Sequence, residues 1–326
     1  MMATLPITRD MWGSAGSLVA GIVSAAIFSM AFVHPGVTFI LLSCVSAFCL
    51  FLAGLAAGVA SGAFASMVAA FALWVFKSAL FGAFYLVLLG LPAIGMTYLA
   101  LRRAPGNDDK WFPEGMLLTL TALYPCVLFA AGVAAAMGHP GGLLGLTNEY
   151  LAAGVEQFRN LTDAQQFTYF VNLLAHTLPL IIGCTWILFM LVTMYLSEAG
   201  LKPTRWNLRP DFDIQNLALP QWLFPIAVVC GLVAGFAPPA YAYVGLNLSF
   251  MLGFPFIFAG ISVVHAWAAR SVFRVWILVG YYILLSLPFA FTLIPMFGIT
   301  LLLGVLDQWV NFRRHFAVKS ALGRIR

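Results

Sequence analysis

Residues 51–70 read FLAGLAAGVASGAFASMVAA and place small residues four apart in two parallel rows. One row is Gly54, Gly58, Gly62 and Ser66, and alanines with one serine form the second. Because residues four apart lie on one face of a helix, this pattern predicts a face almost without side chains. In lipid, such a face allows two helix backbones to approach closely. Two uses remain open: tight helix packing, or a thin wall beside a binding cavity.

The composition decides the class of protein. Of the 326 residues, 63% are hydrophobic and 8% are charged, whereas a soluble domain carries roughly 25% charged residues. The chain is therefore predicted to be an all-α, polytopic bundle of transmembrane helices. No polar stretch is long enough to fold alone, so we expect a single membrane domain over residues 1–326 and no soluble domain.

The apolar runs predict about ten membrane spans, within a range of eight to ten, at about 20 apolar residues per crossing. The run 275–306 contains Pro288 and Pro295 near its middle, which favours a hairpin of two short spans over one long helix. The predicted spans are 14–32, 37–56, a third ending near 75, 80–101, 113–137, 163–195, 222–236, 243–266 and the two within 275–306.

A different pattern appears near residues 148–160. Leu151, Val155 and Phe158 recur at helical spacing, and the charged residues point away from them. This spacing predicts a short amphipathic helix that lies in the membrane interface.

The basic residues predict the orientation in the membrane. With ten spans and a cytoplasmic N-terminus, all of the 16 Lys and Arg residues except Lys77 and Arg159 fall on the cytoplasmic side. This is the distribution of the positive-inside rule, and it predicts that the C-terminus is cytoplasmic too. Since the basic residues flank apolar spans, the net charge of +5 does not indicate nucleic-acid binding.

Uncharged polar residues within the spans are the candidates for ligand binding. Asn172 and His176 share a helix face, Asn247 lies in a later span, and His265 lies near the inner end of that span. Asparagine and neutral histidine can hydrogen-bond a polar ligand without the burial of a full charge. The alternative is an interhelical hydrogen bond that fixes packing, or, for His265, an interfacial position beside Arg270.

Small residues repeat elsewhere as well. Gly21 belongs to a row of small residues in the first span, so we expect close packing at Gly21, as at Gly54, Gly58 and Gly62.

Motifs for catalysis are absent from the sequence. It contains no Gly-x-Ser-x-Gly or His-Glu-x-x-His motif and no P-loop. The five cysteines lie in apolar runs and read as small buried hydrophobes. We therefore expect no catalytic residues, no metal site, no cofactor and no enzymatic activity. Active transport by such a chain requires a gradient or a separate energising subunit.

Two short runs are the most distinctive in the chain: GISVVH at 260–265 and the closing run LDQWVNFRR at 306–314. They resemble the YybS-like family of bacterial polytopic membrane proteins, and Asp307, Trp309, Arg313 and Arg314 look like its closing signature. Further similar runs are WFPEG at 111–115, LRP at 208–210, LPQWL at 219–223, GLNL at 245–248 and PF at 255–256.

The resemblance implies a multi-pass protein of the bacterial inner membrane. The family is in turn distantly similar to the substrate-binding subunits of energy-coupling-factor transporters, which usually have six helices rather than about ten. The similarity implies a bound solute and a separate energising or partner subunit, besides the lipid bilayer. A mostly apolar pocket with a few placed polar groups suits a small amphipathic solute.

The expected function is small-solute binding or transport, with Asn172, His176 and Asn247 as polar contacts. The alternative is a membrane scaffold that binds a partner without transport, and the third is an intramembrane enzyme.

Overall fold

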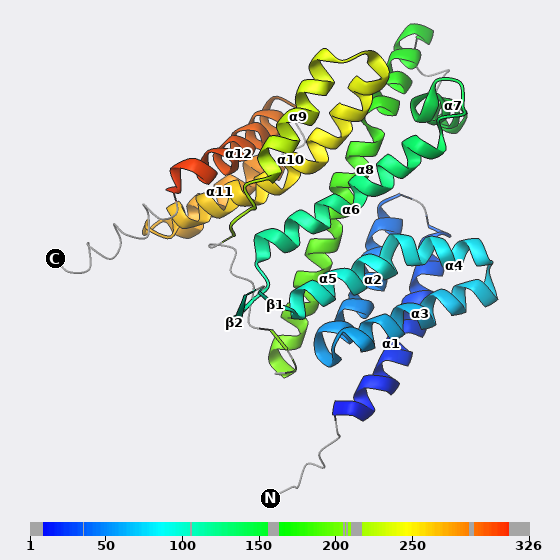
Figure 1. Ribbon diagram of the computed structural model, residues 1–326, viewed down its shortest axis with the longest axis vertical. Helices are drawn as coiled ribbons and strands as arrows, with labels where there is room; N and C mark the ends of the chain where they lie inside the picture. The colour runs from blue at the N-terminus through cyan, green and yellow to red at the C-terminus, as the bar shows by residue number, and fades with distance from the viewer. Residues whose placement is uncertain are drawn as a thin grey trace, which may run out of the picture. The chain divides into compact units, whose positions relative to one another are not determined.

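The computed structural model describes residues 9–34, 36–104, 106–155, 163–204, 206, 208–209, 217–286 and 290–312. This part of the chain is almost entirely helical (Figure 1). The helices are α1 (Arg9–Ala31), α2 (Val37–Ala57), α3 (Val59–Phe76), α4 (Ala79–Tyr85), the π-helical turn η1 (Leu86–Gly90), α5 (Leu91–Leu101), α6 (Glu114–Ala135), α7 (Gly142–Val155), α8 (Ala164–Leu201), the 3-10 turn η3 (Lys202–Thr204), α9 (Leu223–Phe236), α10 (Pro239–Ala268), α11 (Arg274–Ser286) and α12 (Ala290–Val310). Strands β1 (Arg103–Ala104) and β2 (Asn107–Trp111) form an antiparallel pair with Arg103 opposite Trp111.

Seven helical stretches of the described chain are long and apolar enough to cross a membrane. They are Gly13–Ala31, Val37–Ala57, Val59–Phe76, Ala79–Leu101, Glu114–Ala135, Gln165–Thr204 and Pro239–Ala268. Three further apolar helices are shorter: Leu223–Phe236, Arg274–Ser286 and Pro295–Val310. By length and composition, the chain has the helices of a multi-pass membrane protein.

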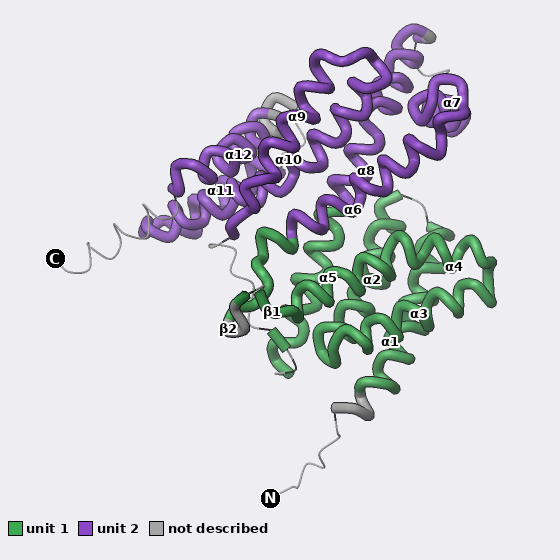
Figure 2. The backbone as a smooth tube through the Cα atoms, in the orientation of Figure 1, with its two compact units in different colours: residues 1–117, 187–212 green, residues 118–186, 213–326 purple. Residues whose placement is uncertain are grey.

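The chain divides into two compact units (Figure 2). Unit 1 consists of Met1–Leu117 and Ile187–Phe212, and unit 2 consists of Leu118–Trp186 and Asp213–Arg326. This division into units does not test the prediction of one membrane domain over residues 1–326, which stays a prediction.

Helix α3 is the centre of unit 1, where it packs against α1, α2, α4, η1 and α5. The contacts pass through small residues. A Cβ on Gly21 of α1 would lie 2.5 Å from the carbonyl oxygen of Ala65, and a Cβ on Gly82 of α4 would lie 2.6 Å from that of Ala70. At both positions the bare backbone allows a neighbouring helix to come within contact distance.

The glycine row of residues 54–66 does not lie on one helix, and that prediction is wrong. Gly58 has φ 99°, a conformation that glycine adopts readily, and α2 ends before it while α3 begins after it. No atom lies within 4 Å of a Cβ built on Gly58, so this glycine makes a turn and not a packing contact.

The turn at Gly58 brings its two neighbours in the row together. A Cβ on Gly62 would lie 3.0 Å from the Cα of Gly54, and one on Gly54 would lie 2.7 Å from Thr97 of α5. The small residues therefore face each other across a reversal of the chain.

Three hydroxyl groups join α1, α2 and α4 in the interior of unit 1. The Ser24 hydroxyl lies 2.6 Å from the Tyr85 hydroxyl and 2.8 Å from that of Ser46. All three side chains are fully buried, and the Tyr85 ring packs edge-on against Phe28 at 5.0 Å between centroids. This network gives the buried hydroxyl groups of Ser24, Ser46 and Tyr85 hydrogen-bond partners.

Helix α10 is the centre of unit 2, where α9, α11 and α12 pack against it. Its contacts with α9 and α12 again pass through glycine. A Cβ on Gly245 would lie 2.6 Å from the Cys230 carbonyl oxygen, and those on Gly260 and Gly304 would overlap the carbonyl oxygens of Thr300 and Phe256. The interior includes Phe129, Met251 and Phe256.

The amphipathic helix predicted near 148–160 is displaced in the structure. Helix α7 begins at Gly142 rather than at 148, and residues 156–160 lie outside the described residues. Gly141 and Gly142 have φ 78° and 62° and turn the chain. Directly after this turn, Leu143 and Leu144 pack against the core of unit 2, and these contacts favour an earlier start of the helix.

The apolar run 275–306 forms two helices, α11 and α12, as the sequence predicts, and residues 287–289 between them lie outside the described part. The two helices contact each other, and both contact α10.

The contact at Gly21 can be tested by adding one methyl group. We expect Gly21→Ala to lower the free energy of unfolding in mild detergent by about 1–3 kcal/mol, because its Cβ meets the Ala65 carbonyl. The control is Gly95→Ala in α5, where a Cβ meets nothing within 4 Å. Equal thermal unfolding temperatures for the two variants would contradict this packing.

Candidate functional site

Asn247 of α10 is fully buried, and its amide group joins α10 to α8. Its Oδ1 accepts a hydrogen bond from the Leu180 backbone N–H at 2.8 Å, and its Nδ2 donates to the His176 carbonyl oxygen at 3.1 Å. Nδ2 also donates to the Tyr243 carbonyl oxygen at 2.9 Å, one turn earlier on α10. Both amide hydrogens and the amide oxygen of Asn247 are thus engaged.

The position of Asn247 follows from a proline in α8. In an unbroken helix the Leu180 N–H donates to the His176 carbonyl oxygen. Pro179 lies between them, inside α8, and proline lacks an N–H and disturbs the turn that precedes it. The Asn247 amide bonds to the donor and to the acceptor of that turn, and so acts as a substitute peptide group. Helices α8 and α10 remain close one turn later, where a Cβ on Gly183 of α8 would lie 2.7 Å from the Met251 side chain of α10.

His176 presents its imidazole beside this junction. Its Nδ1 lies 2.7 Å from the Asn172 carbonyl oxygen. Since a carbonyl can only accept, Nδ1 carries the proton, and in the neutral ring Nε2 is a hydrogen-bond acceptor. The ring is partly exposed and meets the Tyr243 ring edge-on at 6.0 Å between centroids.

Tyr243 lies on the same face of α10 as Asn247 and is 5% exposed. Its ring packs against Phe129 of α6 at 5.8 Å. Its hydroxyl lies close to Thr147 of α7 but forms no hydrogen bond of good geometry within the part of the chain that the structure describes. The Thr147 hydroxyl itself donates to the Leu143 carbonyl oxygen at 2.8 Å. A buried hydroxyl with spare bonding capacity is uncommon in proteins.

Two of the four predicted ligand-binding residues, His176 and Asn247, contact each other at the α8–α10 junction, which we call the Asn247 site. Asn247 contributes its side chain, His176 its ring and its carbonyl, and Asn172 its carbonyl, while the Asn172 side chain is exposed. His265 lies elsewhere, 18 residues further along α10, about 27 Å at 1.5 Å per residue. Its Nε2 lies 2.8 Å from the Tyr282 hydroxyl of α11.

Sequence reasoning did not select Tyr243, although its spacing from Asn247 gives a signal. The two residues are four apart, so they share a helix face.

The predicted family-signature residues are described only in part. Asp307 of α12 is 3% exposed, and the Trp309 ring packs edge-on against Phe224 of α9 at 4.7 Å. Arg313 and Arg314 lie outside the described residues.

A buried arginine holds several segments of unit 1 together. Arg209 is 7% exposed and donates to the carbonyl oxygens of Ala100 and Phe112, both at 3.1 Å. It also lies 3.4 Å from the Glu114 carboxylate. Arg209 thereby links the end of α5, the end of the β1–β2 hairpin and the start of α6.

Two electrostatic effects oppose each other at Arg209. Burial lowers the pKa of its guanidinium, whereas the nearby carboxylates of Glu114 and Glu198 raise it. Arg209 appears above only within the run LRP at 208–210. Its burial and its contacts depend on tertiary packing, which cannot be deduced from residue spacing along the chain.

Among the described residues, no three His, Cys, Asp or Glu side chains come close enough together to hold a metal ion. The predictions of no metal site, no cofactor and no catalytic residue stay predictions.

A scan against protein-family models found no match to this chain, and searches of curated proteins and of solved structures found none either.

The role of Asn247 can be tested with a double-mutant cycle. Asn247→Ala removes the groups that bond to Leu180 and His176, and we expect it to lower the free energy of unfolding by about 1 kcal/mol. Pro179→Ala restores the N–H of residue 179. The turn can then become regular, so that the Leu180 N–H donates to the His176 carbonyl within the helix. In the Pro179→Ala background, Asn247→Ala should lower the free energy of unfolding by less than half as much as in the original protein. Equal losses in the two backgrounds, measured by denaturant unfolding in detergent, would mean that Asn247 does not bridge the proline turn.

The Arg209 contacts predict a large effect of a substitution at this buried position. We expect Arg209→Met to lower the free energy of unfolding by about 3–5 kcal/mol, because it removes the donors to the Ala100 and Phe112 carbonyls and leaves the partly buried Glu114 carboxylate without this cation. The control is Arg103→Met in β1, whose exposed guanidinium lies over the Trp111 ring at 3.8 Å. The control should change stability by less than about 1 kcal/mol. Equal thermal unfolding temperatures for Arg209→Met and Arg103→Met would show that the Arg209 contacts do not stabilise the protein.

Proposed function

We propose that this chain is a multi-pass protein of the bacterial inner membrane that binds a small amphipathic solute at the Asn247 site. The observation that carries the proposal is the buried Tyr243 hydroxyl, which has spare hydrogen-bonding capacity and belongs to a ring that meets the His176 ring edge-on. Around these groups the site is apolar, with Phe129 packed on Tyr243. A few placed polar groups in apolar surroundings are typical of small-molecule sites.

The chemistry of the two side chains specifies the polar part of the solute. His176 Nε2 is an acceptor and the Tyr243 hydroxyl is a donor and an acceptor. The solute is therefore proposed to carry an N–H or O–H donor with an acceptor close to it.

Asn247 takes a different part in this proposal from the one expected from the sequence. Its amide is already engaged by three backbone groups. We assign it to positioning of the site, because it holds α8 against α10 at the proline turn.

The proposal extends to the topology. It takes the three shorter apolar helices, Leu223–Phe236, Arg274–Ser286 and Pro295–Val310, as membrane crossings, which gives ten with both termini cytoplasmic. The positive-inside distribution of Lys and Arg supports this orientation. The proposal contains no catalytic step, and it assigns any energy input to a gradient or a separate subunit, in keeping with the YybS-like resemblance.

A matched pair of variants tests the proposal. Full-length protein is purified in mild detergent, and small molecules that remain bound are identified and quantified by mass spectrometry. Tyr243→Phe removes only the hydroxyl and should weaken binding of the retained solute between about two- and twelvefold, the value of one hydrogen bond. Tyr241→Phe, at a 66% exposed position of the same helix, should leave binding unchanged. Absence of any bound solute, or equal retention by both variants, would refute the proposal.

A further inference from the structure

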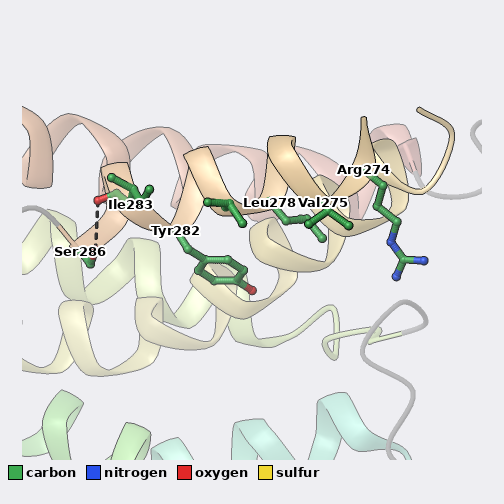
Figure 3. A pocket seen from close by; sticks show the side chains of 7 residues that line it. Arg274, Val275, Leu278, Tyr282, Ile283 and Ser286 are labelled. Carbon is green, nitrogen blue, oxygen red and sulfur yellow. Dashed lines mark hydrogen bonds between the residues drawn. The ribbon is translucent and has the colours of Figure 1, made fainter. Parts of the chain in front are cut away.

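Helix α11 carries an open groove of about 560 Å³ along one face (Figure 3). In contrast to α10, α11 has no fully buried residue. The residues that line the groove all belong to α11: Arg274, Val275, Leu278, Val279, Tyr282, Ile283 and Ser286. They recur at one-turn intervals, so the groove runs along the helix for about 18 Å at 1.5 Å per residue.

The groove is apolar along its length and basic at one end. The Arg274 guanidinium lies at that end, and aliphatic side chains follow it along the helix (Figure 3). Tyr282 is fixed by its hydrogen bond with His265 at 2.8 Å, and the Ser286 hydroxyl donates to the Ile283 carbonyl oxygen at 3.0 Å. The polar groups beyond Arg274 are thus already paired, which leaves the guanidinium as the charged contact for a ligand.

Two features favour an anion at the Arg274 end. Arg274 is the first residue of α11, and the start of a helix carries a partial positive charge that adds to that of the guanidinium. Arginine also presents a planar set of donors that matches phosphate oxygens. Trp276, 74% exposed next to this end, is the residue type that anchors helices at the level of the lipid headgroups.

From this combination we infer that the α11 groove binds an anionic phospholipid. The phosphate is held by Arg274 at the start of α11, and one acyl chain lies along Leu278, Val279 and Ile283. A single narrow row of aliphatic side chains on one exposed helix suits an extended hydrocarbon chain, and the basic end gives preference to a negatively charged headgroup. This site is separate from the Asn247 site in residues and in ligand.

Lipid titration of the full-length protein by native mass spectrometry tests the inference. The delipidated protein is titrated with phosphatidylglycerol and, in parallel, with zwitterionic phosphatidylcholine. We expect tighter binding of phosphatidylglycerol, and about fivefold weaker binding of it by Arg274→Gln, the contribution of one basic residue at an anionic lipid surface. Val279→Trp fills the groove with an indole ring and should reduce binding of both lipids.

Two controls match these variants. Lys110→Gln removes a basic residue from β2, and Leu302→Trp adds an indole ring at a 57% exposed position of α12. Neither should alter lipid binding. The inference is overturned if the two lipids bind equally, if Arg274→Gln equals Lys110→Gln, or if Val279→Trp equals Leu302→Trp. It is also overturned if the groove is covered by a second copy of the chain, seen as a dimer that Val279→Trp disrupts.

Discussion

Backbone contact between helices is the constraint on which both units depend. At Gly21, Gly82 and Gly245, an added Cβ would lie 2.5–2.6 Å from a carbonyl oxygen of the neighbouring helix. In lipid, apolar side chains gain little by leaving hydrocarbon for one another, so association depends on short-range contact and on hydrogen bonds. Within each unit, neighbouring helices therefore lie so close at these glycines that an added methyl group would not fit between them.

The second constraint is that every backbone N–H and C=O in lipid needs a partner. The long helices of unit 2 contain Pro125, Pro179, Pro255 and Pro295, and each proline removes one helical hydrogen bond. Beside Pro179, Asn247 bonds to the Leu180 N–H and the His176 carbonyl, the next pair along the helix, whereas the carbonyl that loses its donor to the proline is that of Ala175. A polar residue in a span can thus be fully engaged by backbone groups, as Asn247 is. For this reason we assign solute contact to Tyr243 and His176.

Much of the fold could be predicted from the sequence because hydropathy and charge act locally. The helix ends near residues 31, 57, 76 and 101 follow from the apolar runs and the turn residues, and so does the division of residues 275–306 into two helices. The start of α7 could not be predicted, since it depends on the packing of Leu143 and Leu144 against other helices.

The candidate site was predictable to a smaller extent. Asn172, His176 and Asn247 stood out because polar residues are rare in spans; Asn247 bonds to the His176 carbonyl, whereas the Asn172 side chain is exposed. Spacing shows which residues share a face, but not which faces meet. The sequence therefore grouped His265 with the others, and it left Arg209 without a role despite its burial.

The reversal at Gly58 has a consequence for how α2 and α3 enter a bilayer. Its N–H donates to the Gly54 carbonyl at 2.9 Å, and its carbonyl accepts from Ser61 and Gly62 at 3.0 and 3.3 Å. Both backbone polar groups of Gly58 are thus bonded within the chain, and this single residue connects α2 to α3. A connection this short suits α2 and α3 to enter the lipid together, as one helical hairpin.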